Sequence, residues 1–390
     1  MKHSVDRILT THVGSLPRVR GLADIIVAGQ EGKTIDPASY AAALDTALGE
    51  VIARQIECGI DIGNDGELPR PSFFSYITDR MSGFGPGTSD RFDRPLPLDA
   101  KKFPIWFNQI STGGRRRLNV YQFVHAVGEI RYGDTAAVDK ECDDFLNQLK
   151  KQKTGFAEPF MTAVSPGFAG TALMNEHYDS HENYVYALAR ALKTEYERIA
   201  AHGMVLQIDS PDLGMERAGY FQDNTLSEFL DAMDMHIDAL NLALENVPAD
   251  QVRLHACWGN RDGPHVHDIP VNDVLPVMYR AKVGGISLPF ANPRHQHEIE
   301  AFRELPLPDN MVAVIGVIET TGNYVEHPIT VAERLCRAAA CVGDRERIIA
   351  GTDCGFGTIV GDTFTAEDVV WAKLKSLREG ADIASKRLWG

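Results

Sequence analysis

The chain has 390 residues, a length that suits one large α/β domain or two smaller ones, each with its own apolar core. With 44% hydrophobic and 24% charged residues and no apolar run near the roughly 18 residues of a membrane span, the composition excludes a membrane protein. The formal net charge of -15 argues against a nucleic-acid-binding surface, because phosphate binding depends on lysine and arginine.

The beginning of the chain and its cysteines indicate the compartment. The segment MKHSVDRILTTHVGS has no continuous apolar stretch and no small-residue cleavage site, so we expect no secretory signal and, by default, a cytoplasmic location. Six cysteines are too sparse in so long a chain to indicate a disulfide scaffold. In a reducing compartment they stay thiols, which can bind metal.

Apolar runs typical of strands alternate along the chain with amphipathic stretches typical of helices. The predicted strands lie at 7–13, 59–65, 156–164, 204–210, 252–257, 284–290, 311–319 and 347–353. The predicted helices between them include 36–59, 181–202, 225–245, 325–342 and 365–382. The first helix has Asp36 at its N-cap and Pro37 at its first position, and it stops at Gly59. Repeated β then α units predict an α/β fold, a (β/α)8 TIM barrel, with a doubly wound sheet as the alternative.

One long interval breaks this alternation. Between the second strand and the third, proline and glycine cluster in GFGPGTSDRFDRPLPLD at 83–99, and the basic run GGRRRLNV follows at 113–120. We predict a single domain over 1–390, with a rim insertion of hairpins and a helix at about 83–155. The basic run is expected to be a solvated hairpin tip, or else a contact for an anionic substrate group.

Polar and sulfur-bearing side chains follow the predicted strands at their carboxyl ends, where such barrels carry their catalytic groups. The set comprises Ser15, Asp65, Glu67, Asp209, His255, Cys257, Glu319, Thr320, Asp353 and Cys354. Residues two apart in a strand point to the same side, so His255 and Cys257 of LHACWGN can both face the barrel mouth. Cys354 of GTDCGFG would join them only through the fold.

Zinc is the metal that these three side chains suit, because it accepts a mixed tetrahedron of imidazole and thiolate donors. Two cysteines and one histidine leave a fourth position open, a feature that separates catalytic from structural zinc. The alternative is a buried cysteine beside a hydrogen-bonded histidine.

The remaining polar residues also have two interpretations. Glu67 and Asp209 either cap a neighbouring helix or bind an ammonium group and activate a group near the metal. Four histidines in polar loops are expected to be solvated or to support other residues rather than to bind metal: His265, His267, His295 and His297. Three cysteines on the predicted helices are expected to be core thiols: Cys58, Cys336 and Cys341.

Six motifs in this order resemble one known family. They are TTHVGSLPR, GNDGELPRPSFFSY, LQIDSPDL, LHACWGN, FANPRHQHE and GTDCGFG. The chain is similar, from about residue 7 to its end and apart from the interval above, to the C-terminal catalytic barrel of cobalamin-independent methionine synthase and to its short single-barrel relatives. These relatives include methyltransferases that use a corrinoid or another donor, and an epoxyalkane to coenzyme M transferase.

The resemblance implies zinc-dependent alkyl transfer to a thiol, in which the acceptor sulfur binds the metal as thiolate and attacks the alkyl carbon in line. By position in the motifs, the residues that match zinc ligands are His255, Cys257 and Cys354. The residues that match the groups holding the amino acid end of homocysteine are Val13, Gly14, Ser15, Glu67 and Asp209, and the last two are the catalytic candidates.

The chain departs from the family pattern at three places. The glutamate that is a further zinc ligand in the long synthases is matched by Pro289, which leaves either solvent or a neighbour for that position. The tryptophan that stacks on the folate pterin falls at about Pro166. The long synthases also have a second, N-terminal barrel, which is lacking here, so polyglutamylated folate would have less to bind.

Three functions therefore stay open. The first is methylation of homocysteine to methionine by a zinc enzyme. The second keeps zinc and thiol but opens an epoxide, with arginines such as Arg18, Arg70 and Arg115 to Arg117 meeting the sulfonate of a coenzyme M-like thiol. The third is a metal-free barrel related to uroporphyrinogen decarboxylase. The expected partners are a small thiol and an alkyl donor, with no nucleic acid and no membrane, and exposed outer helices leave a homo-oligomer open.

Overall fold

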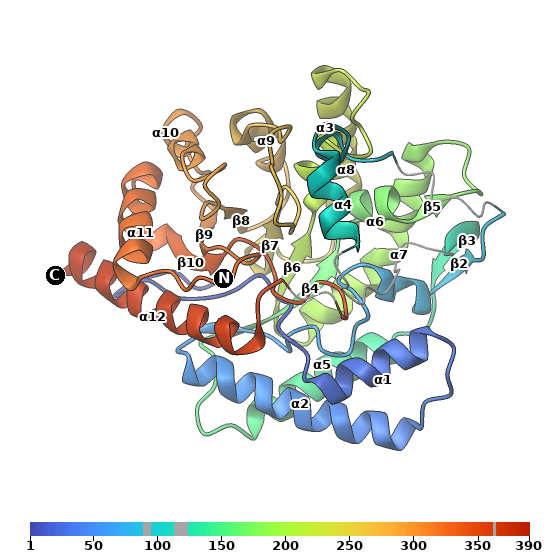
Figure 1. The fold of residues 1–390 in the computed structure, drawn as a ribbon, viewed down its shortest axis with the longest axis horizontal. Helices are drawn as coiled ribbons and strands as arrows, with labels where there is room; N and C mark the ends of the chain where they lie inside the picture. Colours follow the sequence, from blue (N-terminus) through green and yellow to red (C-terminus); the bar gives the residue numbers. More distant parts are fainter. Residues whose placement is uncertain (89–94, 113–123, 362–363) are drawn as a thin grey trace.

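A curled parallel sheet forms the centre of the computed structural model, which describes residues 1–88, 95–112, 124–361 and 364–390 (Figure 1). The neighbours in the sheet follow the order β1-β4-β6-β7-β8-β9-β10, and every pair is parallel. Their bounds are β1 Ile62–Gly63, β4 Glu158–Val164, β6 Val205–Asp209, β7 Val252–His255, β8 Gly285–Pro289, β9 Val312–Ile318 and β10 Ile348–Thr352. Each strand falls inside one of the predicted strand segments.

The first predicted strand, 7–13, closes the barrel as two isolated parallel bridges rather than as a full strand. Thr10 pairs with Ala350 of β10 and Thr11 pairs with Ile62 of β1. The Thr11 N–H donates to the Ala350 carbonyl over 2.8 Å, and the Ile62 N–H donates to the Thr10 carbonyl over 3.0 Å. The predicted α/β class and (β/α)8 barrel are therefore confirmed, and the doubly wound alternative is wrong.

Helices surround the sheet on its outer side (Figure 1). Their bounds are α1 Arg20–Gln30, α2 Pro37–Glu57, α5 Ala136–Lys150, α6 Pro166–Ala172, α7 His181–Ala201, α8 Leu226–Ala243, α9 Val271–Met278, α10 Ala301–Glu304, α11 Pro328–Val342 and α12 Glu367–Trp389. The Asp36 carboxylate caps α2 by accepting the Ser39 N–H over 3.0 Å, and Gly59 follows its end with φ +80°. In the part of the chain that the structure covers, no helix combines the length and apolar character needed to cross a membrane.

Strand alternation separates two environments. On β6, Leu206 and Ile208 face the helices and belong to the main core, whereas Val205 packs in a small apolar cluster inside the barrel. On β7, Arg253 points inward and is buried, where it donates to the Gln207 side chain over 2.7 Å and to the His12 carbonyl over 3.0 Å. Because residues two apart lie on the same side of a strand, His255 at the end of β7 also faces inward, at the barrel mouth.

The interval after β1 builds a rim over one side of the barrel. Strands β2 Met81–Gly85 and β3 His125–Tyr132 pair antiparallel, and β3 pairs parallel with the short β5 Met174–Asn175. Helices α3 Leu98–Lys102 and α4 Pro104–Thr112 lie above the sheet, while α5 packs against α2 and α7 in the outer ring (Figure 1). The basic run 113–120 lies outside the described residues. The division into one domain with an insertion at 83–155 stays a prediction.

Candidate active site

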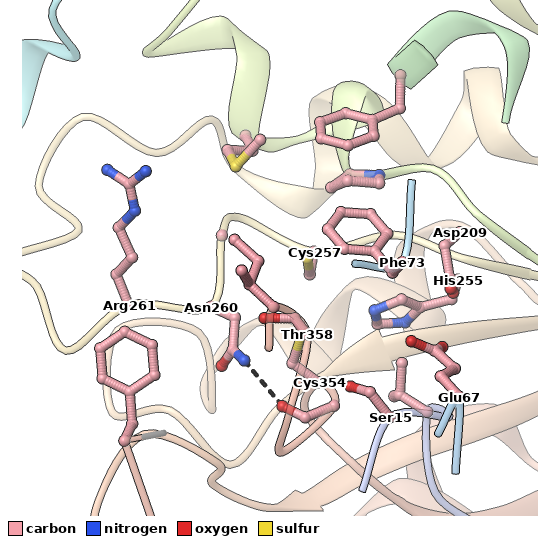
Figure 2. Close-up of a pocket in the computed structure, with 18 residues that line it drawn as sticks. Ser15, Glu67, Phe73, Asp209, His255, Cys257, Asn260, Arg261, Cys354 and Thr358 are labelled. Carbon is pink, nitrogen blue, oxygen red and sulfur yellow. Dashed lines mark hydrogen bonds between the residues drawn. The ribbon is translucent and has the colours of Figure 1, made fainter. Parts of the chain in front are cut away.

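A cavity of about 80 Å³, here called the inner cavity, opens where the barrel strands end (Figure 2). Loops after the first segment, β1, β4, β6, β7 and β10 line it. The lining residues that carry the argument below are Val13, Ser15, Glu67, Phe73, Phe168, Asp209, Met215, His255, Cys257, Asn260, Arg261 and Cys354. The carboxyl ends of the strands therefore hold the predicted residues, as expected for this fold.

His255, Cys257 and Cys354 come together at one point of the inner cavity. One ligand atom from each lies within 4.8 Å of the others, although Cys354 is about a hundred residues away in sequence. The His255 ring is buried, and neither of its nitrogens has a hydrogen-bond partner. A buried imidazole without partners is costly, and a divalent ion at this point would satisfy it, so the three side chains fit the metal that they were predicted to bind.

The charges of the two sulfurs are also interdependent. The Cys354 thiol and the His255 ring hold the pKa of Cys257 well below its usual range, whereas the pKa of Cys354 is raised well above its usual range by Cys257 and by burial. Of the two adjacent sulfurs, Cys257 is therefore the more readily ionised. Among the described residues, this group offers three metal ligands. The side chain of Pro289, at the end of β8, has no atom that could be a fourth ligand.

Glu67 and Asp209 supply two buried carboxylates beside this group (Figure 2). The Glu67 Oε1 atom accepts a hydrogen bond from the Thr162 hydroxyl over 2.9 Å, and its Oε2 atom has no partner. Asp209 Oδ1 accepts from the Gln207 amide over 2.8 Å. Burial raises the pKa of Asp209 to about 7, with Glu67 adding to the rise and His255 opposing it. Neither residue is the N-cap of a helix, and both carboxylates line the inner cavity.

The backbone around Gly14 is shaped to admit the Glu67 carboxylate. A Cβ atom on Gly14 would lie 2.7 Å from Glu67 Oε1 and 2.6 Å from Thr162 Cγ2, so a side chain there would displace the carboxylate. Ser15 and Val13 line the inner cavity on either side of this glycine. Glu67 itself has φ +56°, an uncommon conformation for a non-glycine residue, and it follows Gly66, whose φ is also positive.

Two of the arginines considered for a sulfonate do not line the inner cavity. Arg18 donates to the carbonyls of Gly357 and Glu67 over 2.6 and 2.8 Å. Arg70 donates to Glu141 over 2.7 Å and to Thr162 over 2.9 Å. Arg18 and Arg70, which could meet a sulfonate in the second function, hold loops and side chains of the protein itself. Arg115 to Arg117 lie outside the described residues.

Sequence reasoning missed several residues of the wall. Asn260 donates to the Gly355 carbonyl over 2.8 Å and accepts from Thr320 over 3.0 Å, which ties the β7 and β10 loops together (Figure 2). Asn260 is the last residue of the segment LHACWGN and Arg261 follows directly, a position that could have indicated both. Phe73 of the loop after β1 and Phe168 of α6 stack with ring centroids 5.2 Å apart, a contact that no local pattern signals.

A second, larger cavity adjoins the first. This rim cavity has a volume of about 350 Å³ and lies between the rim helices and the β6 and β7 loops. Trp106, Phe107 and Ile110 of α4 line one side, and the two cavities share Met215, Gly259 and Arg261. Pro166, the position of the family tryptophan, is the first residue of α6 and carries no aromatic ring for stacking on a pterin.

The four loop histidines behave in different ways. His297 is exposed, as expected, and His267 pairs with Asp99 over 2.5 Å. His265 and His295 are buried, and both contact Asp268. These two rings therefore form a structured cluster and are not solvated loop side chains.

A closed parallel barrel with imidazole, thiol and carboxylate groups at its strand ends defines a barrel enzyme with its site in the carboxyl-end loops. The family model described as the catalytic domain of cobalamin-independent synthase matches residues 157–379, more than half of the chain. The chain belongs to this family, as its motifs predicted, and is a transferase of the methionine synthase type.

Individual relatives cover nearly the whole chain. A methionine synthase of Sulfurisphaera tokodaii is 22% identical over 380 residues, which are 97% of this chain and 93% of that protein. A 2-hydroxypropyl-CoM lyase of Xanthobacter autotrophicus is 24% identical over 375 residues, 88% of this chain and 86% of that protein. A solved B12-independent methionine synthase from Shewanella sp. W3-18-1, in complex with selenomethionine, has the same fold, with a TM-score of 0.70, 20% identity and coverage of 98% and 99%.

Proposed function

We propose that this protein is a zinc-dependent thiol S-alkyltransferase that methylates homocysteine to methionine. One observation carries the proposal: a His-Cys-Cys group with an unpartnered imidazole and two buried carboxylates line the same small cavity. When bound to His255, Cys257 and Cys354, zinc would supply a positive charge that keeps an acceptor thiol deprotonated at neutral pH. The unpartnered His255 ring favours this proposal over a metal-free barrel.

Glu67 and Asp209 support an amino acid as the acceptor. An ammonium group placed between them would give Glu67 Oε2 a partner and would offset the repulsion between two buried carboxylates. A sulfonate in the same position would add a third negative charge. These two residues therefore favour homocysteine over a coenzyme M-like thiol.

The alkyl donor is assigned to the rim cavity. It is about four times larger than the inner cavity, it has aromatic and apolar walls, and it meets the inner cavity at Met215, Gly259 and Arg261. In the reaction the bond between the alkyl carbon and the donor breaks, a carbon–sulfur bond to the acceptor forms, and the thiol proton is released. Asp209, with a pKa near neutrality, is placed to take up that proton when it is ionised.

The test is an acceptor comparison with zinc-loaded protein. Homocysteine and coenzyme M are each offered with methyltetrahydrofolate, methylcobalamin or epoxypropane, and the thioether product is identified by mass spectrometry. We expect methionine from homocysteine and a loss in kcat/KM of roughly 10- to 150-fold in Glu67→Gln, the effect of a hydrogen bond to a charged group. Alkylation of coenzyme M by epoxypropane without any turnover of homocysteine would establish the lyase-type alternative and refute the proposal.

A further inference from the structure

Beside the inner cavity, two histidines and an aspartate converge in the same way as the His-Cys-Cys group. His265, Asp268 and His295 each offer a ligand atom, and these atoms lie within 4.8 Å of one another. The residues come from two loops, one after β7 and one after β8. At most about a tenth of each side chain is exposed to solvent, so the cluster is built into the wall.

The inner nitrogens of the two rings share a single oxygen atom. His265 Nδ1 lies 2.7 Å from Asp268 Oδ2, and His295 Nε2 lies 2.8 Å from the same atom. Their outer nitrogens also have acceptors: His265 Nε2 faces the Arg261 carbonyl at 3.1 Å and His295 Nδ1 faces Glu298 at 2.8 Å. Metal-binding histidines are typically held in this manner, by a carbonyl or carboxylate on the nitrogen that does not bind the ion.

The proton count of the cluster leads to two alternatives. Four ring nitrogens face acceptors, so without a metal ion both histidines must be doubly protonated to donate every bond. Two imidazolium rings then balance the two carboxylates of Asp268 and Glu298. A divalent ion between the inner nitrogens and Asp268 would replace two protons and leave the total charge at zero. Replacing two protons by one divalent ion therefore leaves the net charge of these four side chains unchanged.

Two further features point to a built site. His265 has φ +52°, and it and Glu67 are the non-glycine residues with positive φ among those that the structure describes. Such a conformation persists where its surroundings enforce it, as at ligand sites. His265 and Asp268 also line the rim cavity, which gives an ion there an open side. The His295 ring stacks on Trp258, with centroids 4.6 Å apart, next to Cys257 in the chain.

We propose that His265, Asp268 and His295 form a second metal site, which binds a divalent transition ion such as zinc through two imidazoles and one carboxylate. Imidazole favours first-row transition ions over magnesium or calcium. The cluster has no sulfur ligand, so it does not suit the soft ions that prefer thiolates. The ion sits in the wall of the rim cavity, where its open position faces the space assigned to the alkyl donor. The binding claim rests on the cluster alone, whereas this last role rests on the proposed function.

Metal analysis after dialysis against a weak chelator tests the site. We expect about two equivalents of zinc in the wild type and about one in both the Cys257→Ser/Cys354→Ser double variant and Asp268→Asn. His265→Asn is a second variant, in which asparagine tolerates the left-handed backbone. His267→Asn removes a neighbouring histidine that pairs with Asp99 and should keep the wild-type content. Thermal melts confirm that each variant is folded.

Calorimetric titration of the double cysteine variant with zinc, in buffers of different ionisation enthalpy, gives a second readout. The exchange predicts release of about two protons per ion near neutral pH, because metal ligands must be deprotonated to bind. Cobalt(II) in the same variant should show no thiolate charge-transfer absorption. A single equivalent in the wild type that is lost with the cysteines and kept in Asp268→Asn would overturn the proposal. A single equivalent in the wild type that is lost only in Asp268→Asn would support this second site and would contradict zinc binding by the His-Cys-Cys group.

Discussion

The Thr162 hydroxyl donates a hydrogen bond to Glu67 Oε1 over 2.9 Å. The same hydroxyl oxygen accepts a hydrogen bond from Arg70 over 2.9 Å, and Arg70 in turn donates to Glu141 over 2.7 Å. A chain of buried polar groups thus fixes one oxygen of Glu67 and leaves Oε2 without a partner. In the proposed function, binding of the acceptor by Glu67 therefore depends on residues that do not touch the acceptor.

Thr162→Val keeps the volume of the side chain and removes this hydroxyl. We expect the KM for homocysteine to rise roughly 10-fold or more with little change in kcat, because Glu67 loses a charge-assisted hydrogen bond worth about 1.5–3 kcal/mol. Steady-state kinetics with the donor at saturation measures the change. Thr46→Val, at an exposed position of α2, is the matched control. A rise in the KM for the donor alone would contradict this role of Thr162.

Cys257→Ser removes one sulfur from the His-Cys-Cys group. We expect the variant to hold about one equivalent of zinc less than the wild type and to lose at least about 100-fold in kcat, since even changes outside the ligand shell cost 10- to 100-fold. Cys336→Ser is the control, because Cys336 lies on α11 away from the cavity. Full activity of Cys257→Ser after exhaustive chelation would exclude a catalytic metal at this group.

Trp106→Ala tests the rim cavity as the donor site. We expect the KM for the donor to rise about 3- to 10-fold, the size of an aromatic contact of about 0.5–1.5 kcal/mol, with the KM for homocysteine unchanged. Initial rates over a range of donor concentrations provide the measurement. Trp389→Ala, at the end of α12, serves as the control. A rise in the KM for homocysteine with no change in the KM for the donor would contradict the assignment of the donor to the rim cavity.

Regular features of the barrel and part of the site could be predicted from the sequence. Period-two alternation placed His255 and Cys257 on one face, and barrel geometry brought Cys354 to them. The segment 7–13 was predicted as a strand, but its weak pairing was not, because Thr10 and Thr11 make only single bridges to β10 and β1. Its pairing depends on neighbours that are remote in sequence.

Loop contacts set the limit of such reasoning. Arg70 reads in sequence as a free cation near a motif, but in the structure it is committed to Glu141 and Thr162. His265 and His295 were expected to be solvated or to support other residues, and two separate loops bring both to Asp268. Neither arrangement follows from spacing, because the path of a loop decides which side chains meet.

Asp65 links the site to the pH dependence of stability. Its Oδ1 atom accepts the Glu67 N–H over 2.9 Å, and its Oδ2 atom is buried without a partner. Burial, with Glu141 adding to the effect and Arg70 opposing it, raises the pKa of Asp65 from 3.8 to about 7. Between these values the folded protein holds a proton that the unfolded chain releases. The free energy of unfolding therefore falls as the pH rises through this window.

Asp65→Asn removes the ionisable group and keeps an acceptor for the Glu67 N–H. The wild type should lose a few kcal/mol in its free energy of unfolding between about pH 4 and about pH 8, since one pKa unit corresponds to about 1.4 kcal/mol. The variant should not show this loss, so its stability relative to the wild type should be higher at about pH 8 than at about pH 4. Urea unfolding at several pH values measures the difference. Asp36→Asn provides the contrast, because Ser39 lowers the pKa of the Asp36 carboxylate below 3.8. Its contribution is therefore complete above that value and is lost only as the pH falls further, so this variant should leave the difference between about pH 4 and about pH 8 unchanged. Equal pH dependence in wild type and Asp65→Asn would mean that Asp65 is ionised at neutral pH and that a cation inside the protein offsets its charge.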